Sequence, residues 1–118
     1  MQVVEGVVIG GNRLGRTLGF PTANMDLADR NDLANGVYRS EVEIDGRRYR
    51  AMSNVGVRPS VDGRTRLLET HIFDFHGDLY GRVLRVVLIE KIRDERKFSS
   101  VEELRAQLEY DKEQIAQQ

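Results

Sequence analysis

The chain has 118 residues, of which 40% are hydrophobic and 31% are charged, a composition typical of one globular domain. Its 18 basic and 19 acidic side chains give a net charge of -1, which excludes a general electrostatic attraction to nucleic acid or to an anionic membrane. The absence of cysteine excludes disulfides and thiol chemistry, and no segment reaches the roughly 18 apolar residues of a membrane span. We therefore expect a single cytoplasmic domain over residues 1–118 with one site, and no nucleic-acid or membrane partner.

The first half of the chain reads as β-strands joined by tight turns. Residues 3–9 are largely apolar and β-branched and stop at Gly10-Gly11. Residues 37–44 alternate, with Tyr38, Ser40, Val42 and Ile44 on one face. Asp45-Gly46 is typical of a two-residue hairpin, so residues 47–55 are expected to return beside the preceding strand.

Two further strands are expected after a turn at Gly63. Residues 67–75 alternate, which would place Leu67, Glu69, His71, Phe73 and Phe75 on one face before a turn at residues 76–78. Residues 82–92 contain an apolar run from Val86 to Ile89 that is typical of burial on both faces. We predict that this last strand is the central strand of the sheet.

The hydrophobic period changes near the C-terminus. Ser99 and Ser100 are followed three residues later by Glu102 and Glu103, which gives two overlapping capping-box patterns. A helical stripe follows, formed by Val101, Leu104, Leu108 and Ile115. Short strands with glycine-rich turns before one helix predict a mainly β fold, namely a small closed or nearly closed antiparallel barrel with a C-terminal α-helix.

A glycine-rich loop precedes the second part of the barrel. Residues 10–17 read G-x-x-x-x-G-R-T, one residue away from the P-loop pattern, which requires lysine where Arg16 stands. A P-loop must lead into a helix, and the L-G-F-P sequence that ends at Pro21 cannot start one there. The loop and Arg16 could still bind phosphate through backbone amides and charge, or could simply form a glycine-rich hairpin.

Thr22 and Asn24 are the first candidate site residues. If the segment after Pro21 is extended, side chains two residues apart point the same way, so the hydroxyl and the amide would converge. Both are hard oxygen ligands suited to Mg²⁺ that takes its other ligands from water and nucleotide phosphates. The alternative is a turn in which both side chains satisfy backbone groups.

Glu69 is the second candidate, because a carboxylate within an apolar strand is costly to bury and could accept a hydroxyl proton as a general base. The alternative is an ion pair between Glu69 and an arginine on a neighbouring strand. We interpret His71, on the same face, as structural.

Residues 47–50, R-R-Y-R, could form a nucleic-acid patch. Glu41 and Glu43 lie on the partner strand of the same hairpin, so a solvated face of paired charges is the better interpretation.

Taken together, these motifs resemble the riboflavin kinase family. The resemblance covers nearly the whole chain and is carried by six segments: G-G-N-R-L-G-R-T-L-G-F-P-T-A-N (10–24), G-V-Y (36–38), N-V-G-V-R-P (54–59), L-E-T-H-I-F-D-F (68–75), L-Y-G (79–81) and I-R-D-E-R-K-F (92–98). P-T-A-N followed at a distance by E-T-H is the most specific part. Ser60 stands where many members have threonine.

The resemblance implies a six-stranded antiparallel Greek-key barrel with a C-terminal helix, and transfer of the ATP γ-phosphate to the 5'-hydroxyl of riboflavin, giving FMN and ADP. It implies a divalent-metal site, with Mg²⁺ as the expected ion, at Thr22 and Asn24, and Glu69 as the catalytic base. The residues implied in nucleotide binding are Gly10, Arg16, Thr22 and Tyr80. The residues implied on the flavin side are Arg93, Arg96 and Glu103.

The same resemblance extends to the C-terminal domain of bifunctional bacterial FAD synthetases, so an FMN adenylyltransferase domain could be linked to this one in a longer chain. The sequence contains no H-x-G-H stretch for adenylyl transfer. We therefore expect that the chain alone forms no FAD. A barrel that binds flavin or nucleotide without catalysis is the alternative function.

Overall fold

The computed structural model describes residues 1–10, 16, 18–28, 30–60 and 63–118. Within these ranges the elements are β1 (Gln2–Val7), β2 (Ala23–Asp26), β3 (Gly36–Ile44), β4 (Arg47–Ser60), β5 (Gly63–Ile72), β6 (Val83–Arg93) and α2 (Val101–Ala116). Most of the glycine-rich loop, residues 11–15 and 17, lies outside the described residues, so the structure does not test its predicted role.

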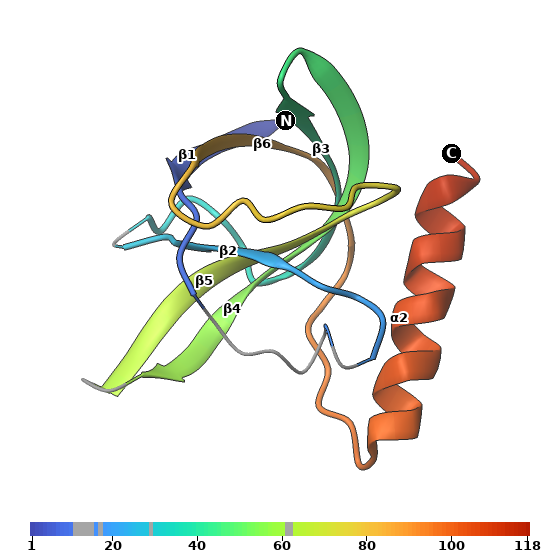
Figure 1. Ribbon diagram of the computed structural model, residues 1–118. Helices are drawn as coiled ribbons and strands as arrows, with labels where there is room; N and C mark the ends of the chain where they lie inside the picture. The colour runs from blue at the N-terminus through green and yellow to red at the C-terminus, as the bar shows by residue number, and fades with distance from the viewer. Residues whose placement is uncertain (11–15, 17, 29, 61–62) are drawn as a thin grey trace.

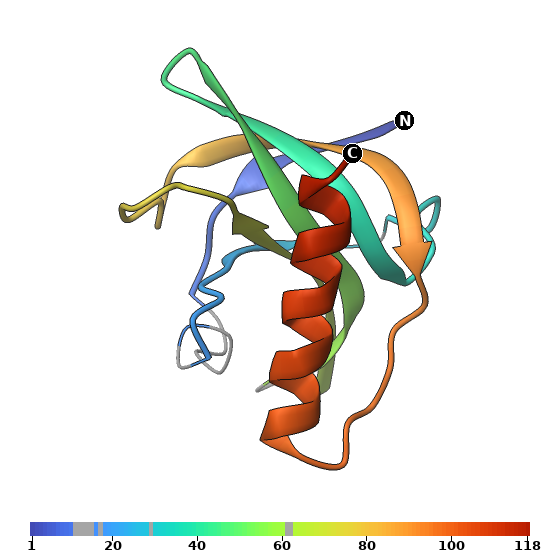
Figure 2. The same ribbon diagram turned by 90° about the vertical axis from the view of Figure 1, so that its right-hand side faces the viewer.

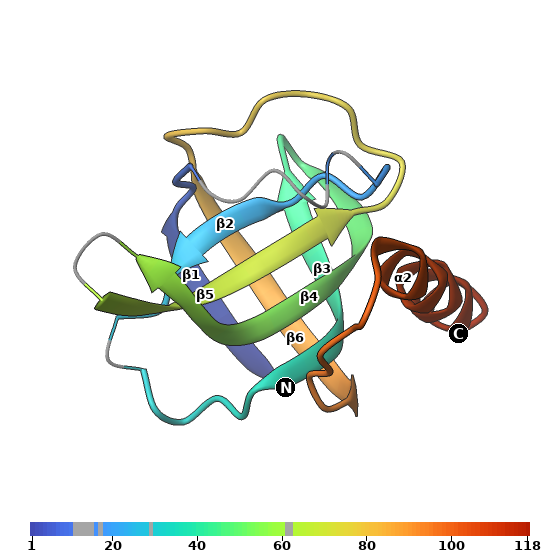
Figure 3. The same cartoon turned by 90° about the horizontal axis from the view of Figure 1, so that it is seen from below.

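All strand pairs are antiparallel, and the strand order in the sheet is β1-β6-β3-β4-β5-β2. Strands β3, β4 and β5 follow one another, and β6 returns to lie beside β3, which is a Greek key. The sheet curls until its two edges meet, where the Ile9 N–H donates to the Asn24 carbonyl at 2.8 Å (Figure 3). The predicted mainly β barrel with one C-terminal helix is confirmed.

The β3–β4 hairpin follows its sequence closely. Asp45 and Gly46 both have positive φ, 52° and 83°, as a two-residue hairpin turn requires. The side chains predicted to share the inner face of β3 are all buried, namely Tyr38, Ser40, Val42 and Ile44.

The prediction that the last strand is central is wrong. β6 pairs with β1 and β3, but the two middle places in the sheet belong to β3 and β4. Val86 and Leu88 are buried in the barrel, whereas Val87 and Ile89 are only partly buried, so β6 is not equally covered on its two faces. An apolar run reflects how much of a strand is covered, and it does not determine the place of that strand in the sheet.

The predicted common face of residues 67–75 also needs correction. β5 ends at Ile72, and Asp74 has a φ of 59°, which breaks the alternation between Phe73 and Phe75. Phe73, which precedes the break, stays beside His71 and packs in a cluster with Ile115 of the helix. Phe75 instead packs edge-on against Tyr49, with the ring centroids 5.4 Å apart. The other predicted strands differ from the structure only at their ends, and β2 is a strand in a segment for which the sequence had offered an extended conformation as one of two alternatives.

The hydrophobic core has two parts. The larger part fills the barrel, and its fully buried members include Met25, Val55 and Leu68. The smaller part joins the outside of the barrel to α2 and consists of Leu18, Phe20, Val37, Met52, Phe73 and Ile115. The helix α2 therefore lies beside the barrel. The segment that follows β6 loops outward before it reaches the start of α2 (Figures 1 and 2).

The first turn of α2 is held by hydrogen bonds rather than by packing. The Glu103 N–H donates to Ser100 Oγ at 3.2 Å, and the Glu103 carboxylate accepts from the Ser99 N–H and hydroxyl. This confirms Ser100 as the N-cap with Glu103 three residues later, although the Glu103 carboxylate binds Ser99 and not the Ser100 N–H that a complete capping box uses. Val101 is 49% exposed, so its expected place on the helical stripe does not bury it. No helix in the described ranges is both long and apolar enough to cross a membrane.

Candidate functional site

The register of three neighbouring strands brings the candidate residues together. Asn24 on β2 is the cross-strand partner of Glu69 on β5, and Glu69 is in turn the partner of Asn54 on β4. Directly opposed residues in an antiparallel sheet project from the same face, with Cβ atoms about 5 Å apart. Asn24, Glu69 and Asn54 therefore form one row on the outer face of the barrel wall.

Thr22 and Asn24 converge as predicted. The Thr22 hydroxyl donates to Asn24 Oδ1 at 3.3 Å, and the Asn24 side chain is buried. Two hard oxygens at this spacing fit a divalent cation. Neither oxygen is charged, and the described residues contain no cluster of three acidic or histidine side chains suited to a metal. A cation here would need phosphate oxygens to complete its ligands.

A first cavity, of about 680 Å³, lies at the end of the barrel between β2 and the segment after β5. It is lined by the four residues predicted for nucleotide binding, Gly10, Arg16, Thr22 and Tyr80, and also by Asn24. Both its volume and its mixture of backbone and polar side chains are those of a small-molecule site.

A second cavity, of about 530 Å³, lies between the outer face of the sheet, the segment that follows β6, and α2. Glu69, Arg93 and Arg96 line it together with the apolar side chains of Phe20, Val37, Met52, Phe98, Leu104 and Leu108. Thr22 lines both cavities, so this residue lies at the boundary between them.

Glu69 combines features of both interpretations made from the sequence. Its side chain is only 16% exposed and lines the second cavity, as a general base would. Its Oε1 also lies 2.8 Å from Nη2 of Arg58 on β4, which is the arginine pair that the alternative required. The ion pair offsets part of the cost of holding a carboxylate in a partly buried position at the cavity wall.

His71 is buried between Phe20 and Phe73. Its Nδ1 lies 2.8 Å from the Pro21 carbonyl, so Nδ1 carries the proton in the neutral ring. Nε2 is buried and has no hydrogen-bond partner among the residues that the structure describes. Burial lowers the pKa of His71 below 6.5, since protonating Nε2 would bury a charge. The structural interpretation of His71 agrees with these contacts.

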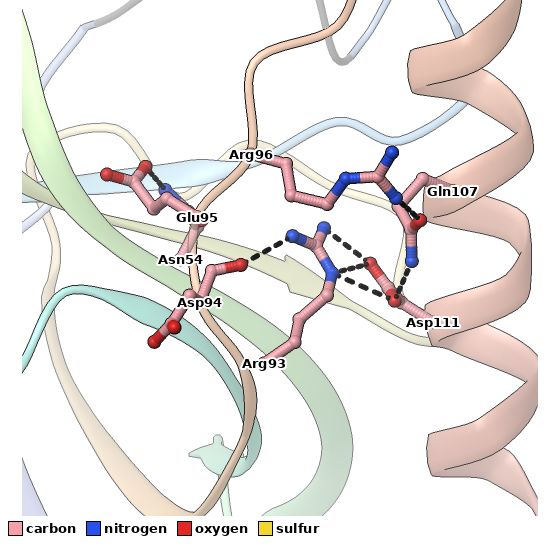
Figure 4. A network of polar contacts seen from close by, with 7 residues as sticks. All are labelled: Asn54, Arg93, Asp94, Glu95, Arg96, Gln107 and Asp111. Carbon is pink, nitrogen blue, oxygen red and sulfur yellow. Dashed lines mark hydrogen bonds and ion pairs between the residues drawn. The ribbon is translucent and has the colours of Figure 1, made fainter.

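Arg93 and Arg96 both line the second cavity, but their charges are already engaged (Figure 4). Arg93 binds the buried Asp111 carboxylate of α2 through Nε and Nη2, the latter at 2.7 Å, and donates to the Asp94 carbonyl. Arg96 donates to Gln107 Oε1 and stacks on Phe98. Arg93, at the end of β6, and Arg96, in the segment that follows, therefore both join this part of the chain to α2.

Glu103 does not line either cavity. Its carboxylate binds Ser99, and these hydrogen bonds hold the pKa of Glu103 below its usual value. The described contacts give Glu103 a capping role at the start of α2.

The basic stretch at residues 47–50 is largely satisfied within the domain. Arg48 lies 3.7 Å from Glu41, and Arg47 stacks on Tyr49. Arg50 donates to the carbonyls of Ala116 and Gln118, where it complements the negative end of α2.

Sequence reasoning missed Arg58, Glu95 and the role of Asn54. Arg58 contacts both Glu69 and Glu95, and Asn54 Nδ2 donates to Glu95 Oε2 at 2.8 Å (Figure 4 shows the last contact). The sequence signal that could have identified Asn54 and Arg58 is their spacing within N-V-G-V-R-P, because residues four apart in a strand lie on the same face.

Comparison with known proteins identifies the family of the chain. The family described as "Flavokinase: Riboflavin kinase" matches residues 2–118. A bifunctional riboflavin kinase/FMN adenylyltransferase of Haemophilus influenzae is 44% identical over 111 residues, covering 93% of this chain and 36% of the relative. An RNA-binding riboflavin kinase, RibR, of Bacillus subtilis is 41% identical over 112 residues, covering 94% of this chain and 48% of the relative. The chain thus spans about a third to a half of these relatives.

Solved structures have the same fold. One from Streptococcus pneumoniae, described as a macrolide-efflux protein, is 46% identical with a TM-score of 0.83, covering 94% of this chain and 37% of that one. Riboflavin kinase from Trypanosoma brucei is 21% identical with a TM-score of 0.64, covering 98% and 77%. The latter supports the fold alone. The family match and the closely related sequences show that the chain belongs to the riboflavin kinase family.

Proposed function

We propose that the chain transfers the γ-phosphoryl group of ATP to the 5'-hydroxyl of the ribityl chain of riboflavin, giving FMN and ADP. The observation that carries this proposal is that Thr22 lines both cavities. Two substrates bound on either side of Thr22 would meet there, and phosphoryl transfer asks the protein chiefly to position them and to stabilise charge.

The first cavity would hold ATP. Arg16 supplies a positive charge for the phosphates, Gly10 offers backbone without a side chain, and Tyr80 contributes a ring at the cavity wall. Thr22 would lie beside the terminal phosphates.

Thr22 and Asn24 would hold the divalent cation, for which Mg²⁺ is the natural choice because both ligands are neutral oxygens and phosphate supplies the charge. The bound cation would neutralise negative charge on the phosphates as the group is transferred.

Glu69 would accept the proton of the 5'-hydroxyl. The hydroxyl oxygen then forms its bond to the γ-phosphorus, and the bond from that phosphorus to the bridging oxygen breaks, which releases ADP. General-base catalysis of this kind typically contributes about 10²- to 10⁴-fold to a rate. The support for this role is the position of Glu69 in the second cavity, opposite Asn24 in the sheet.

The second cavity would hold riboflavin. Its apolar walls suit a planar aromatic ring, and the arginines Arg93 and Arg96 offer donors at its edge. Glu103 would contact the flavin only after leaving Ser99, so we assign it to the flavin side solely on the family resemblance.

FMN adenylyltransferase activity appears in the name of the bifunctional relative, of which this chain spans 36%. We propose that the chain is the kinase domain, residues 1–118, that it works in the cytoplasm, and that it forms no FAD from FMN and ATP. The cytoplasm is consistent with a chain that has no cysteine.

The direct test is to incubate the chain with riboflavin and Mg-ATP and to separate the products chromatographically. Equimolar FMN and ADP, with no FAD, is the expected result. Tight binding of flavin or nucleotide without ADP formation would instead identify a binding barrel. Affinity for oligonucleotides that falls steeply with salt and depends on Arg47, Arg48 and Arg50 would identify a nucleic-acid function.

A further inference from the structure

We infer that Arg58 is a positioning residue for the proposed base Glu69, and that it connects Glu69 to the segment between β6 and α2 through Glu95. This inference rests on the proposed kinase function. A single nitrogen, Nη2 of Arg58, lies 2.8 Å from Glu69 Oε1 and 3.1 Å from Glu95 Oε2. One cation is thus shared by two carboxylates from different parts of the chain.

The strand geometry of β4 builds this arrangement. Asn54, Gly56 and Arg58 alternate along the strand, so they share one face. Asn54 and Arg58 both line the second cavity, and Val55 between them is buried in the barrel core. N-V-G-V-R-P therefore places an amide and a guanidinium on the cavity side of the strand.

Gly56 makes room for the second carboxylate. A Cβ atom at this position would overlap the carboxylate of Glu95, which lies directly over the glycine. From there Glu95 Oε2 accepts from Asn54 Nδ2 at 2.8 Å and pairs with Arg58. Asn54 and Arg58, the polar residues on this face of the motif, thus both contact Glu95. Gly56 is needed between them because a side chain there would occupy the space of the Glu95 carboxylate.

Partial burial strengthens the electrostatic interactions of Arg58 with Glu69 and Glu95. The side chains of Glu69, Arg58 and Glu95 are 16%, 32% and 30% exposed, so water screens them less than it screens ordinary surface pairs. All three line the second cavity. Holding Arg58 on Glu95 limits the directions in which Glu69 can point, and it links the position of the base to that of residues 94–98.

The test compares variants under saturating and limiting riboflavin. Arg58→Ala should lower kcat by about 10- to 100-fold, the loss expected when a reacting group is misplaced by about 1 Å. The KM for riboflavin should change much less. Arg58→Lys retains a positive charge and should recover much of kcat. Arg48→Ala, on the exposed part of the same strand, is the matched control and should leave both parameters unchanged.

A double-mutant cycle with Glu69→Gln tests whether Arg58 acts by positioning Glu69 or in another way. If Arg58 acts through Glu69, Arg58→Ala should cost little further rate when Glu69 is already glutamine. An equal loss in both backgrounds would overturn the inference, as would an unchanged kcat in Arg58→Ala that remains folded by circular dichroism. Recovery by Arg58→Lys would show that a general loss of stability is not the cause, whereas equal losses in the lysine and alanine variants would contradict a role of the charge.

Failure of the proposed function would look different. The unaltered chain would then form no FMN at all, or Glu69→Gln would retain full activity. The first result would overturn the kinase assignment and the second the base assignment, and either would remove the role proposed for Arg58.

Discussion

Asn24 on β2 and Glu69 on β5 are direct cross-strand partners, which places the proposed metal ligand and the proposed base side by side on one face of the barrel. The two residues are 45 positions apart in the chain, counted from their numbers. Their proximity follows from the antiparallel pairing of β2 with β5. A reaction that needs both a cation and a base can therefore be served by two adjacent strands.

Thr22→Ala should weaken the dependence of nucleotide binding on Mg²⁺, because it removes one of two oxygens that lie 3.3 Å apart. We expect kcat/KM for Mg-ATP to fall by about 10- to 100-fold, the range typical when a metal site loses a supporting group. Calorimetric titration of ATP with and without Mg²⁺ measures the effect. Thr22→Ser keeps the hydroxyl and is the control. Unchanged Mg²⁺-dependent binding in the alanine variant would refute the metal assignment.

Asp111→Ala should strongly destabilise the domain. The Asp111 side chain is 2% exposed, and its loss leaves Arg93 partly buried without its carboxylate. Breaking such a pair typically costs about 3–5 kcal/mol of unfolding free energy. Urea denaturation measures the loss, and Asp94→Ala, which removes an exposed partner of Lys91, is the control. Replacing Arg93 and Asp111 together with apolar residues should lower the unfolding free energy by less than the sum of the two single replacements. Additive losses would contradict an interaction between the two side chains.

The stability of the domain should fall as the pH drops through about 6.5, in part because of His71. Burial lowers the folded-state pKa of His71 below its ordinary value of 6.5, so the unfolded chain takes up the proton first. The stabilising contribution is therefore complete above the unfolded pKa and is lost progressively until the lower, folded pKa is reached. Thermal melts at about pH 8 and about pH 5.5 measure it, since the ordinary pKa of histidine lies between these values.

His71→Asn is the informative variant, because an amide can still donate to the Pro21 carbonyl but does not titrate. Its melting temperature should change less with pH than that of the unaltered chain. His76 is present in both proteins and cancels from the comparison. An identical pH dependence in the two proteins would show that His71 does not contribute.

Local patterns predicted much of the fold. The Asp45-Gly46 turn, the buried face of β3 and the Ser100 cap of α2 depend on residues close together in the sequence, and all three were predicted correctly. The place of β6 in the sheet was not, because it depends on pairing between distant strands. Asp74, whose positive φ ends the alternation of β5, carries no clear sequence signal of its own.

In the candidate site, as in the fold, features set by residues close in the sequence were predicted, whereas contacts between distant residues were not. The extended segment after Pro21 allowed the convergence of Thr22 and Asn24 to be predicted from their spacing. The partners of Glu69 and Arg93 could not be chosen from a chain with 18 basic and 19 acidic side chains, since many opposite charges could pair. Only the folded register selects Arg58 for the first and Asp111 for the second.

The proposed mechanism depends above all on phosphorylation of riboflavin with Glu69 as the base. The most direct measurement is FMN formation from riboflavin and Mg-ATP by the unaltered chain and by Glu69→Gln, with the binding of both ligands measured in parallel. If Glu69 is the base, the unaltered chain should form FMN and the variant should lose about 10²-fold or more of that rate, with ligand binding retained. Undiminished turnover by Glu69→Gln would contradict the role of Glu69, and binding without turnover by the unaltered chain would contradict the kinase function itself.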